Sequence, residues 1–238
     1  ARPNFMKIAP IIHAIRNAQS DGVNIQYRLV HTGQHYDKAM SDTFFNELSI
    51  PMPDANLEVG SGSQAVQTAN IMIRFEEDLL KNPTDVVIVV GDINSTMACS
   101  IVTKKLNTQL VHVEAGIRSF DLSLPEEINR MVTDSIADHF FNTSHFANEN
   151  LFKVGIEKSR VHFVGNTMID TLYANLKKFR KPLLWEEHKL DEKKFFLLTL
   201  HRPSNVDDLS TLQNILSQIH STCQGLPVIF PAHPITVA

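Results

Sequence analysis

The chain has 238 residues, of which 43% are hydrophobic and 20% charged, and its formal net charge is −4. This length is enough for one large domain or two smaller ones with a hydrophobic core. The 22 basic and 26 acidic residues nearly balance, which argues against a nucleic-acid-binding surface. The longest apolar runs are well short of the ~18 residues of a membrane-spanning helix, so we expect a soluble protein with no membrane partner.

The two cysteines indicate the redox compartment. Cys99 and Cys223 lie far apart and match no metal-binding spacing. Cys99 falls within an apolar helical pattern, which predicts a buried thiol. Cysteines and histidines form no ligand cluster, so we expect no catalytic metal and no other cofactor. We therefore expect a reducing compartment, namely the cytoplasm.

Apolar strand-like runs alternate with helical patterns along the chain. Strands are predicted over residues 25–31, 86–90, 110–113, 139–142, 161–164, 195–200 and 228–230. Helices are predicted over residues 4–19, 37–48, 64–80, 95–106, 125–137, 147–154, 168–179 and 209–221. Because strands and helices alternate, the pattern predicts an α/β fold with a doubly wound parallel sheet.

A domain boundary is predicted near Gly165. Residues 1–165 are expected to form a Rossmann-like domain, and residues 166–238 a linker helix and an incomplete second domain. Two predicted strands and one helix in the second part are too few for an independent core. The first residues have the pattern of a loop between a strand and a helix, and the last residues lead out of a strand. We therefore expect a fragment of a longer polypeptide.

Three carboxylates occupy positions suited to catalysis. Asp92 directly follows the predicted strand 86–90, Glu114 follows the strand 110–113, and Glu126 lies in the first turn of a predicted helix. In open α/β sheets, ligands bind outside the carboxyl ends of the strands. Carboxylates that share one crevice repel each other's ionisation, so one can act as an acid while another acts as a base.

Several of these candidate residues also have a simpler structural interpretation. Asp92 can cap the following helix, and Glu126 can stabilise a helix dipole. Arg2 and Lys7 flank the first turn of the predicted helix 4–19, where free amides attract phosphate. They can equally be surface charges. The loop before this helix carries no complete Gly-x-Gly-x-x-Gly or P-loop pattern.

The histidines fall into two groups. His201 and Arg202 follow the predicted strand 195–200, and His233 follows the strand 228–230, so these side chains are expected at the ligand-binding edge. The Gln34-His35 pair follows the strand 25–31 and can face the same crevice. His112 lies within a strand and is predicted to be a hydrogen-bonded core residue.

Taken together, these segments resemble the non-hydrolysing UDP-N-acetylglucosamine 2-epimerases. The resemblance runs in order through nearly the whole chain and includes segments 2–10, 31–37, 91–96, 112–119, 125–130, 164–170, 199–203 and 230–234. It implies a GT-B architecture, in which two Rossmann-like domains face each other across a cleft. It also implies interconversion of UDP-GlcNAc and UDP-ManNAc, through elimination of UDP to 2-acetamidoglucal and re-addition.

The resemblance also implies roles for individual residues. The acid/base set consists of Asp92, Glu114 and Glu126, with His201 assisting near the diphosphate. The substrate-binding residues are Arg2, Lys7, Gln34, His35, Arg130, Arg202 and His233. The implied partners are the two UDP-sugars, UDP and a second subunit in a homodimer. The first strand of the family fold and the Ser-Gly-Gly segment that holds UDP are absent from these residues, so we expect weak UDP binding.

Three other functions remain compatible with the sequence. A GT-B glycosyltransferase has the same architecture, since one fold hosts many functions. A hydrolysing relative would release free ManNAc instead of UDP-ManNAc. A truncated, non-catalytic binding domain is the third alternative.

Overall fold

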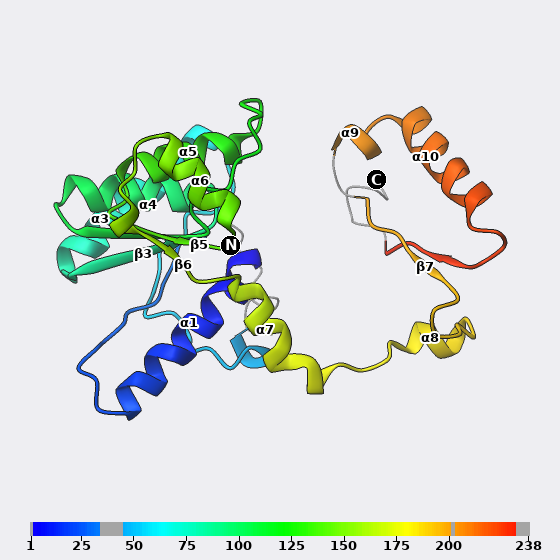
Figure 1. The fold of residues 1–238 in the computed structure, drawn as a ribbon, viewed down its shortest axis with the longest axis horizontal. Coiled ribbons are helices and arrows are strands. Elements are labelled where there is room, and N and C mark those ends of the chain that lie inside the picture. The colour runs from blue at the N-terminus through cyan, green and yellow to red at the C-terminus, as the bar shows by residue number, and fades with distance from the viewer. Residues whose placement is uncertain (1, 34–44, 201–202, 232–238) are drawn as a thin grey trace. The chain divides into compact units, whose positions relative to one another are not determined.

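The computed structural model describes residues 2–33, 45–200 and 203–231, with the side chains of residues 2, 3, 203 and 204 left out. The chain divides into two compact units, Ala1–Lys177 and Lys178–Ala238. Figure 1 shows the helices and strands of each unit. In the described part of the chain, no helix is both long and apolar enough to cross a bilayer.

A four-stranded parallel sheet forms the centre of the first unit. Its order is β3-β4-β5-β6, and the strands span Val86–Val90, Gln109–Val113, His139–Asn142 and Val161–Phe163. β3 pairs with β4 from Val86↔Gln109 to Val90↔Val113, so the carboxyl ends of these two strands lie side by side. This arrangement confirms the predicted α/β fold with a parallel sheet.

Helices cover both faces of this sheet (Figure 1). On one face lie α3 (Gln64–Lys81), α4 (Asn94–Lys105), α5 (Pro125–Ile136) and α6 (His145–Lys153). On the other face lie α1 (Arg2–Ser20) and α7 (Thr167–Asn175), which pack against each other. Two short 3₁₀ helices span Lys158–Arg160 and Leu176–Lys178.

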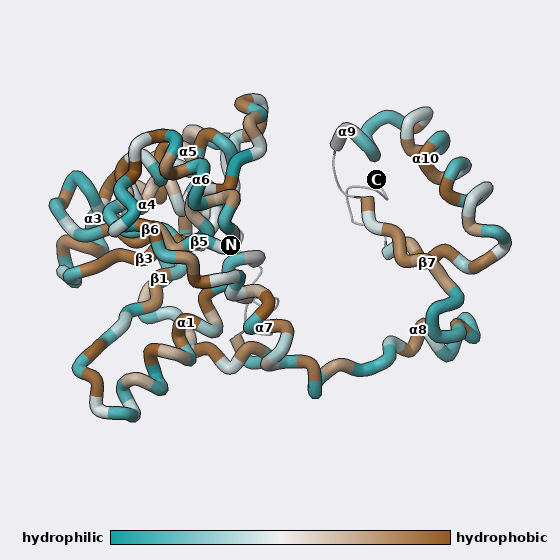
Figure 2. Tube along the Cα trace, in the orientation of Figure 1, coloured by the Kyte–Doolittle hydropathy of each residue, from teal (hydrophilic) through white to brown (hydrophobic). Residues whose placement is uncertain are grey.

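The cores on the two faces follow from the alternation of side chains along each strand. Val89 and Leu110 pack with Ile71, Phe75 and other buried residues on the side of α3 and α4. Val90, Val111 and Val113 form a second cluster, against which Ile8 and Ile11 of α1 pack. Figure 2 shows the hydrophobic character of β3. Strands buried between two helical layers are expected to be apolar on both faces.

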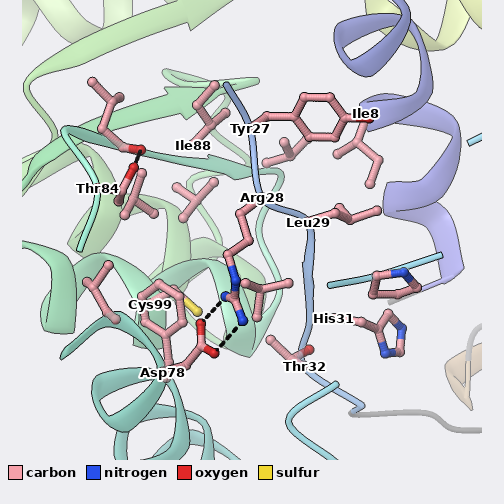
Figure 3. Close-up of a pocket in the computed structure, with 18 of the residues that line it drawn as sticks. Ile8, Tyr27, Arg28, Leu29, His31, Thr32, Asp78, Thr84, Ile88 and Cys99 are labelled. Carbon is pink, nitrogen blue, oxygen red and sulfur yellow. Dashed lines mark hydrogen bonds and ion pairs between the residues drawn. The ribbon is translucent and has the colours of Figure 1, made fainter. Parts of the chain in front are cut away.

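A separate two-stranded parallel sheet is formed by β1 (Val30–His31) and β2 (Ala55–Asn56). A cavity of about 840 Å³ lies between the segment 24–32 and β3, and it is bounded by residues of α1, α3 and α4 (Figure 3).

Charged side chains close part of this cavity. Arg28 reaches from the segment before β1 to α3, where its NH2 group donates to Asp78 Oδ1 at 2.8 Å (Figure 3). The thiol of Cys99 lies at the same cavity and is buried, as predicted. Burial raises the pKa of Cys99 to about 12, which keeps it protonated and unreactive at neutral pH.

The second unit contains α8 (Leu183–Glu187), α9 (Pro203–Val206), α10 (Leu209–Thr222) and a parallel pair, β7 (Phe196–Leu197) and β8 (Val228–Ile229). The side chain of Asp208 caps α10 by accepting from the Thr211 amide. Hydrogen bonds from Ser210 and Thr211 lower the pKa of Asp208 to about 2. In Figure 2, α10 alternates between hydrophobic and hydrophilic residues.

Several elements differ from the sequence-based predictions. The strand expected over residues 25–31 is short, because only Val30 and His31 pair with β2. β7 likewise covers only two of the residues 195–200, and the short elements β2, α8 and α9 were not predicted. Residues 45–47 are helical, and the rest of the predicted helix 37–48 lies outside the described residues, apart from a turn at its end.

The compact first unit extends beyond the boundary expected near Gly165. It includes α7, because Thr171 Oγ1 donates to the Met6 carbonyl of α1 at 2.6 Å and Thr171 is 4% exposed. The charged stretch after Lys177 separates this unit from the second one. The assignment of residues 166–238 to a distinct functional domain stays a prediction.

Candidate functional site

Two carboxylates stand at the carboxyl ends of adjacent strands, at the edge where α/β sheets bind their ligands. Asp92 follows β3 and Glu114 follows β4, and these strands are paired in register. The backbone turns sharply at both places, with φ of 75° at Gly91 and 68° at Glu114. A non-glycine residue with positive φ is uncommon and often marks a functional site. The fold therefore brings Asp92 and Glu114 together.

Lys7 contacts Glu114 directly. Its Nζ lies 2.5 Å from Glu114 Oε2, and both side chains are largely buried. Gly91 lies beside this ion pair, because a Cβ atom placed on Gly91 would be 3.1 Å from Lys7 Nζ. The first turns of α1 thus supply a cation to the carboxylate edge, the edge of the sheet where Asp92 and Glu114 lie. This cation faces a catalytic carboxylate candidate, a contact that the sequence did not predict.

Arg130 contacts the second carboxylate. Its NH2 lies 2.5 Å from Asp92 Oδ2, and its NH1 lies 2.8 Å from Glu127 Oε2. Hydrogen bonds and the charges of Asp92 and Glu127 outweigh the effect of burial and raise the pKa of Arg130. Arg130 is therefore a fixed cation that holds the side chain of Asp92 in place.

Asparagines fix the backbone next to these carboxylates. Asn129 Nδ2 donates to the Asp92 carbonyl at 2.9 Å, and Asn4 Nδ2 donates to the Val90 carbonyl at 3.1 Å. Asn94 is buried, and its amide donates to Gln64 and Gln67 of α3. Such hydrogen bonds to loop carbonyls position a reactive side chain without touching a substrate.

Glu127, and not its neighbour Glu126, is the buried glutamate of α5. Glu127 is 1% exposed and accepts hydrogen bonds from the Ser119 amide and hydroxyl and from the Phe120 amide. Burial favours the neutral acid, but these hydrogen bonds and Arg130 more than offset it and lower the pKa of Glu127. Glu127 thus anchors the loop before α5.

A charged network lies directly behind the carboxylate edge. His112 is fully buried in β4, with Nδ1 2.6 Å from Asp134 Oδ1 and Nε2 2.9 Å from the Gly91 carbonyl oxygen. Asp134 Oδ2 also accepts from the Gly116 amide at 3.0 Å and lies 2.6 Å from Arg118 NH1. The prediction of a hydrogen-bonded core histidine is confirmed.

The network makes folding stability sensitive to acid. Burial favours protonated Asp134, but the hydrogen bond and charge of His112 and the charge of Arg118 more than offset it and lower the Asp134 pKa. The unfolded chain then binds a proton at higher pH than the folded chain, so stability is present above about pH 4 and lost as pH falls further.

We expect the free energy of unfolding, measured by urea titration between pH 7 and pH 3, to fall below about pH 4. Asp134→Asn should lower the free energy of unfolding at pH 7, because it leaves His112 and Arg118 without their carboxylate partner. The fall in this free energy below pH 4 should also be shallower in the variant. Asp191→Asn is a matched control, because this carboxylate is 73% exposed. An unchanged acid decline in Asp134→Asn would contradict the assignment.

The remaining predicted site residues are placed only in part. Glu126 is exposed in the first turn of α5, which fits its interpretation as a helix-dipole residue as well as a catalytic one. The backbone of Arg2 lies at the start of α1. Gln34, His35, His201, Arg202 and His233 lie outside the described residues. Their predicted roles stay predictions.

One structural alternative is excluded. α4 begins at Asn94 with Ile93 as its N-cap, and no side chain caps it. Asp92 therefore does not cap this helix; its carboxylate is directed to Arg130. Within the described ranges, no group of three or more His, Cys, Asp or Glu side chains is arranged to hold a metal ion.

Comparison with known proteins assigns the chain to a family. A family model described as UDP-N-acetylglucosamine 2-epimerase matches residues 17–237. The chain belongs to this family. It is 41% identical over 241 residues to the UDP-N-acetylglucosamine 2-epimerase of Methanocaldococcus jannaschii, covering 99% of this chain and 64% of the relative. It is 35% identical to the UDP-2,3-diacetamido-2,3-dideoxy-D-glucuronate 2-epimerase of Pseudomonas aeruginosa.

Solved structures give the same assignment. The chain matches the M. jannaschii UDP-GlcNAc 2-epimerase in complex with UDP-GlcNAc and UDP with a TM-score of 0.84 and 40% identity. It matches a Listeria monocytogenes protein, described as a putative UDP-N-acetylglucosamine 2-epimerase, with a TM-score of 0.86 and 27% identity. The fold is thus that of the GT-B-like epimerases. This family member spans about 64% of the length of the curated relatives it matches.

Sequence reasoning missed Glu127 and Asp134, and it expected Arg130 to bind substrate and not to pair with Asp92. Glu127, Arg130 and Asp134 follow one another along α5 at three- and four-residue spacing, which places them on one face of the helix. That spacing was visible in the sequence. Their partners elsewhere in the chain were not, because Arg118, His112 and Asp92 reach α5 only through the tertiary fold.

Proposed function

We propose that the full-length protein is a UDP-N-acetylglucosamine 2-epimerase of the non-hydrolysing type. The observation that carries this proposal is the match, at 41% identity over 99% of the chain, to the M. jannaschii enzyme. The paired placement of Asp92 and Glu114 at adjacent strand ends supports it further. The substrate would be UDP-GlcNAc, and the product UDP-ManNAc.

The chemistry needs two proton-transfer groups. One carboxylate takes the proton from C2 while the bond from C1 to the UDP oxygen breaks, leaving 2-acetamidoglucal and UDP. UDP then adds back at C1, and a proton is delivered to C2 from the opposite face. Asp92, Glu114 and Glu126 are the proposed set for these transfers. Lys7 and Arg130 orient two of them through the ion pairs described above.

The other site residues complete the proposal. Arg2, Lys7, Gln34, His35, Arg130, Arg202 and His233 would bind the sugar nucleotide, and His201 would assist departure of the diphosphate. We propose a cytoplasmic homodimer that supplies a UDP-sugar for cell-surface polysaccharide synthesis. Two free cysteine thiols fit a reducing compartment.

The decisive experiment is an isotope-exchange assay on the full-length protein. UDP-GlcNAc is incubated in D₂O without any acceptor sugar, and deuterium at C2 and formation of UDP-ManNAc are followed by NMR. Both signals are expected. Release of free ManNAc and UDP would instead indicate a hydrolysing enzyme, and strict dependence on an acceptor would indicate a glycosyltransferase. Binding of UDP without exchange would indicate a non-catalytic domain.

The substrate needs its own comparison, because the P. aeruginosa relative is named for a diacetamido glucuronate sugar. We expect a higher kcat/KM with UDP-GlcNAc, since the relatives at 41% and 38% identity are named for it. A higher kcat/KM with the UDP-2,3-diacetamido uronate would reassign the substrate within the same reaction class.

A further inference from the structure

The buried pair His112–Asp134 connects the two turns that present Asp92 and Glu114. His112 sits in β4, yet its Nε2 bonds to the carbonyl of Gly91 at the end of the neighbouring strand. Asp134 sits on α5, and its second oxygen binds the amide of Gly116, two residues after Glu114. The pair therefore hydrogen-bonds to the backbone one residue before Asp92 and two residues after Glu114.

The hydrogen-bond partners determine what His112 donates. A backbone carbonyl oxygen can only accept, so Nε2 carries a hydrogen. The carboxylate of Asp134 accepts from the Gly116 amide, pairs with Arg118 and lies 2.6 Å from His112 Nδ1. The pair therefore has a backbone partner at each end, Gly91 for His112 and Gly116 for Asp134. Each polar atom of the pair has a partner, as a buried charge requires.

Helix α5 also connects the His112–Asp134 pair to Asp92, through Arg130. Asp134 lies four residues after Arg130, so both side chains project from one face of α5. Arg130 forms an ion pair with the side chain of Asp92. Asp134 accepts a hydrogen bond from the backbone amide of Gly116, just after Glu114. Displacement of α5 would move both carboxylates at once. The two turns also have positive φ, 75° at Gly91 and 77° at Gly116, which such hydrogen bonds hold in place.

We propose that His112 and Asp134 are positioning residues that set the spacing between Asp92 and Glu114 for proton transfer to the two faces of C2. This inference rests on the proposed epimerase function and deepens it. Neither residue touches the substrate: both lie behind the edge, with 0% and 2% of their side chains exposed. They act through the backbone of Gly91 and Gly116.

The test uses His112→Gln and Asp134→Asn in the full-length protein, with Leu110→Ala as the matched control. Leu110 is fully buried in the same strand as His112 and packs in the core instead, so its loss lowers stability without releasing the two turns. Three quantities are measured: kcat per folded molecule, KM for UDP-GlcNAc, and the fraction of turnover released as free 2-acetamidoglucal and UDP.

We expect kcat per folded molecule to fall about 10- to 100-fold in both variants, the scale of a misplacement near 1 Å, with KM changed less than about threefold. The released glucal fraction should rise, because a displaced carboxylate returns its proton slowly. The double variant should be no slower than the slower single variant, since the two residues act as one unit. Leu110→Ala should keep the wild-type kcat and glucal fraction.

Two outcomes distinguish a failure of the proposed positioning role from a failure of the proposed epimerase function. If the wild-type protein exchanges the C2 proton but the variants match Leu110→Ala in kcat and glucal fraction, the pair is only structural and the inference fails. If the wild-type protein neither exchanges the proton nor forms UDP-ManNAc, the proposed function fails, and the positioning role fails with it.

Discussion

Asp92→Asn in the full-length protein is expected to lower turnover by about 10²- to 10⁴-fold, the usual loss when an acid/base group is removed. Asparagine keeps the size and a hydrogen-bonding oxygen for Arg130, so the fold should persist. What is lost is the ability to take up and release a proton. The measurement is kcat for UDP-ManNAc formation, together with deuterium incorporation at C2.

The control for this variant is Asp78→Asn. Asp78 is also a carboxylate paired with an arginine, because Arg28 donates to it from the segment before β1. It lies on α3, away from the carboxyl ends of the strands, so its loss removes the same type of ion pair without the proposed chemistry. Asp78→Asn should keep turnover per folded molecule. Near-normal turnover in Asp92→Asn would remove Asp92 from the mechanism.

Gly116→Ala is expected to cause the largest loss of stability. Gly116 has φ of 77°, and a Cβ atom there would lie 2.4 Å from the Ala147 carbonyl oxygen and 3.0 Å from Leu151 Cγ. The backbone of α6 must therefore move. The unfavourable φ alone costs roughly 1–2 kcal/mol, and with the overlap we expect about 3 kcal/mol or more. The melting temperature should drop by about 6–12 °C.

Gly155→Ala separates the two causes. Gly155 has φ of 87°, yet no atom lies within 4 Å of the position of its Cβ. Only the backbone strain should appear, with a fall in melting temperature of about 2–8 °C. Scanning calorimetry of both variants measures the difference. Equal losses in the two variants would show that the contact with α6 relaxes freely.

The local pattern of the sequence predicted most of the first unit. Five apolar residues at 86–90 and three of the four residues at 110–113 indicated buried parallel strands, because such strands are hydrophobic on both faces. The helices of this unit were found within a few residues of their ends. Short elements such as β2 were missed, since two residues carry too little periodicity to detect.

The candidate site was predictable in part. That Asp92 and Glu114 lie at strand ends follows from the sequence, and parallel pairing then makes them neighbours. The contacts of Lys7 with Glu114 and of Arg130 with Asp92 join residues more than 35 positions apart. Local pattern contains no information about such pairs, because they depend on how α1 and α5 pack against the sheet.

The sequence by itself determined the α/β class, the family resemblance and the identity of the carboxylates at the strand ends. Those properties depend on residue type and local periodicity, which the chain carries directly. Only the tertiary structure decided that Glu127 anchors a loop while Glu126 is exposed, and that His112 and Asp134 join two turns behind the carboxylates. Burial and hydrogen-bond partners arise when distant segments pack together, so no local pattern specifies them.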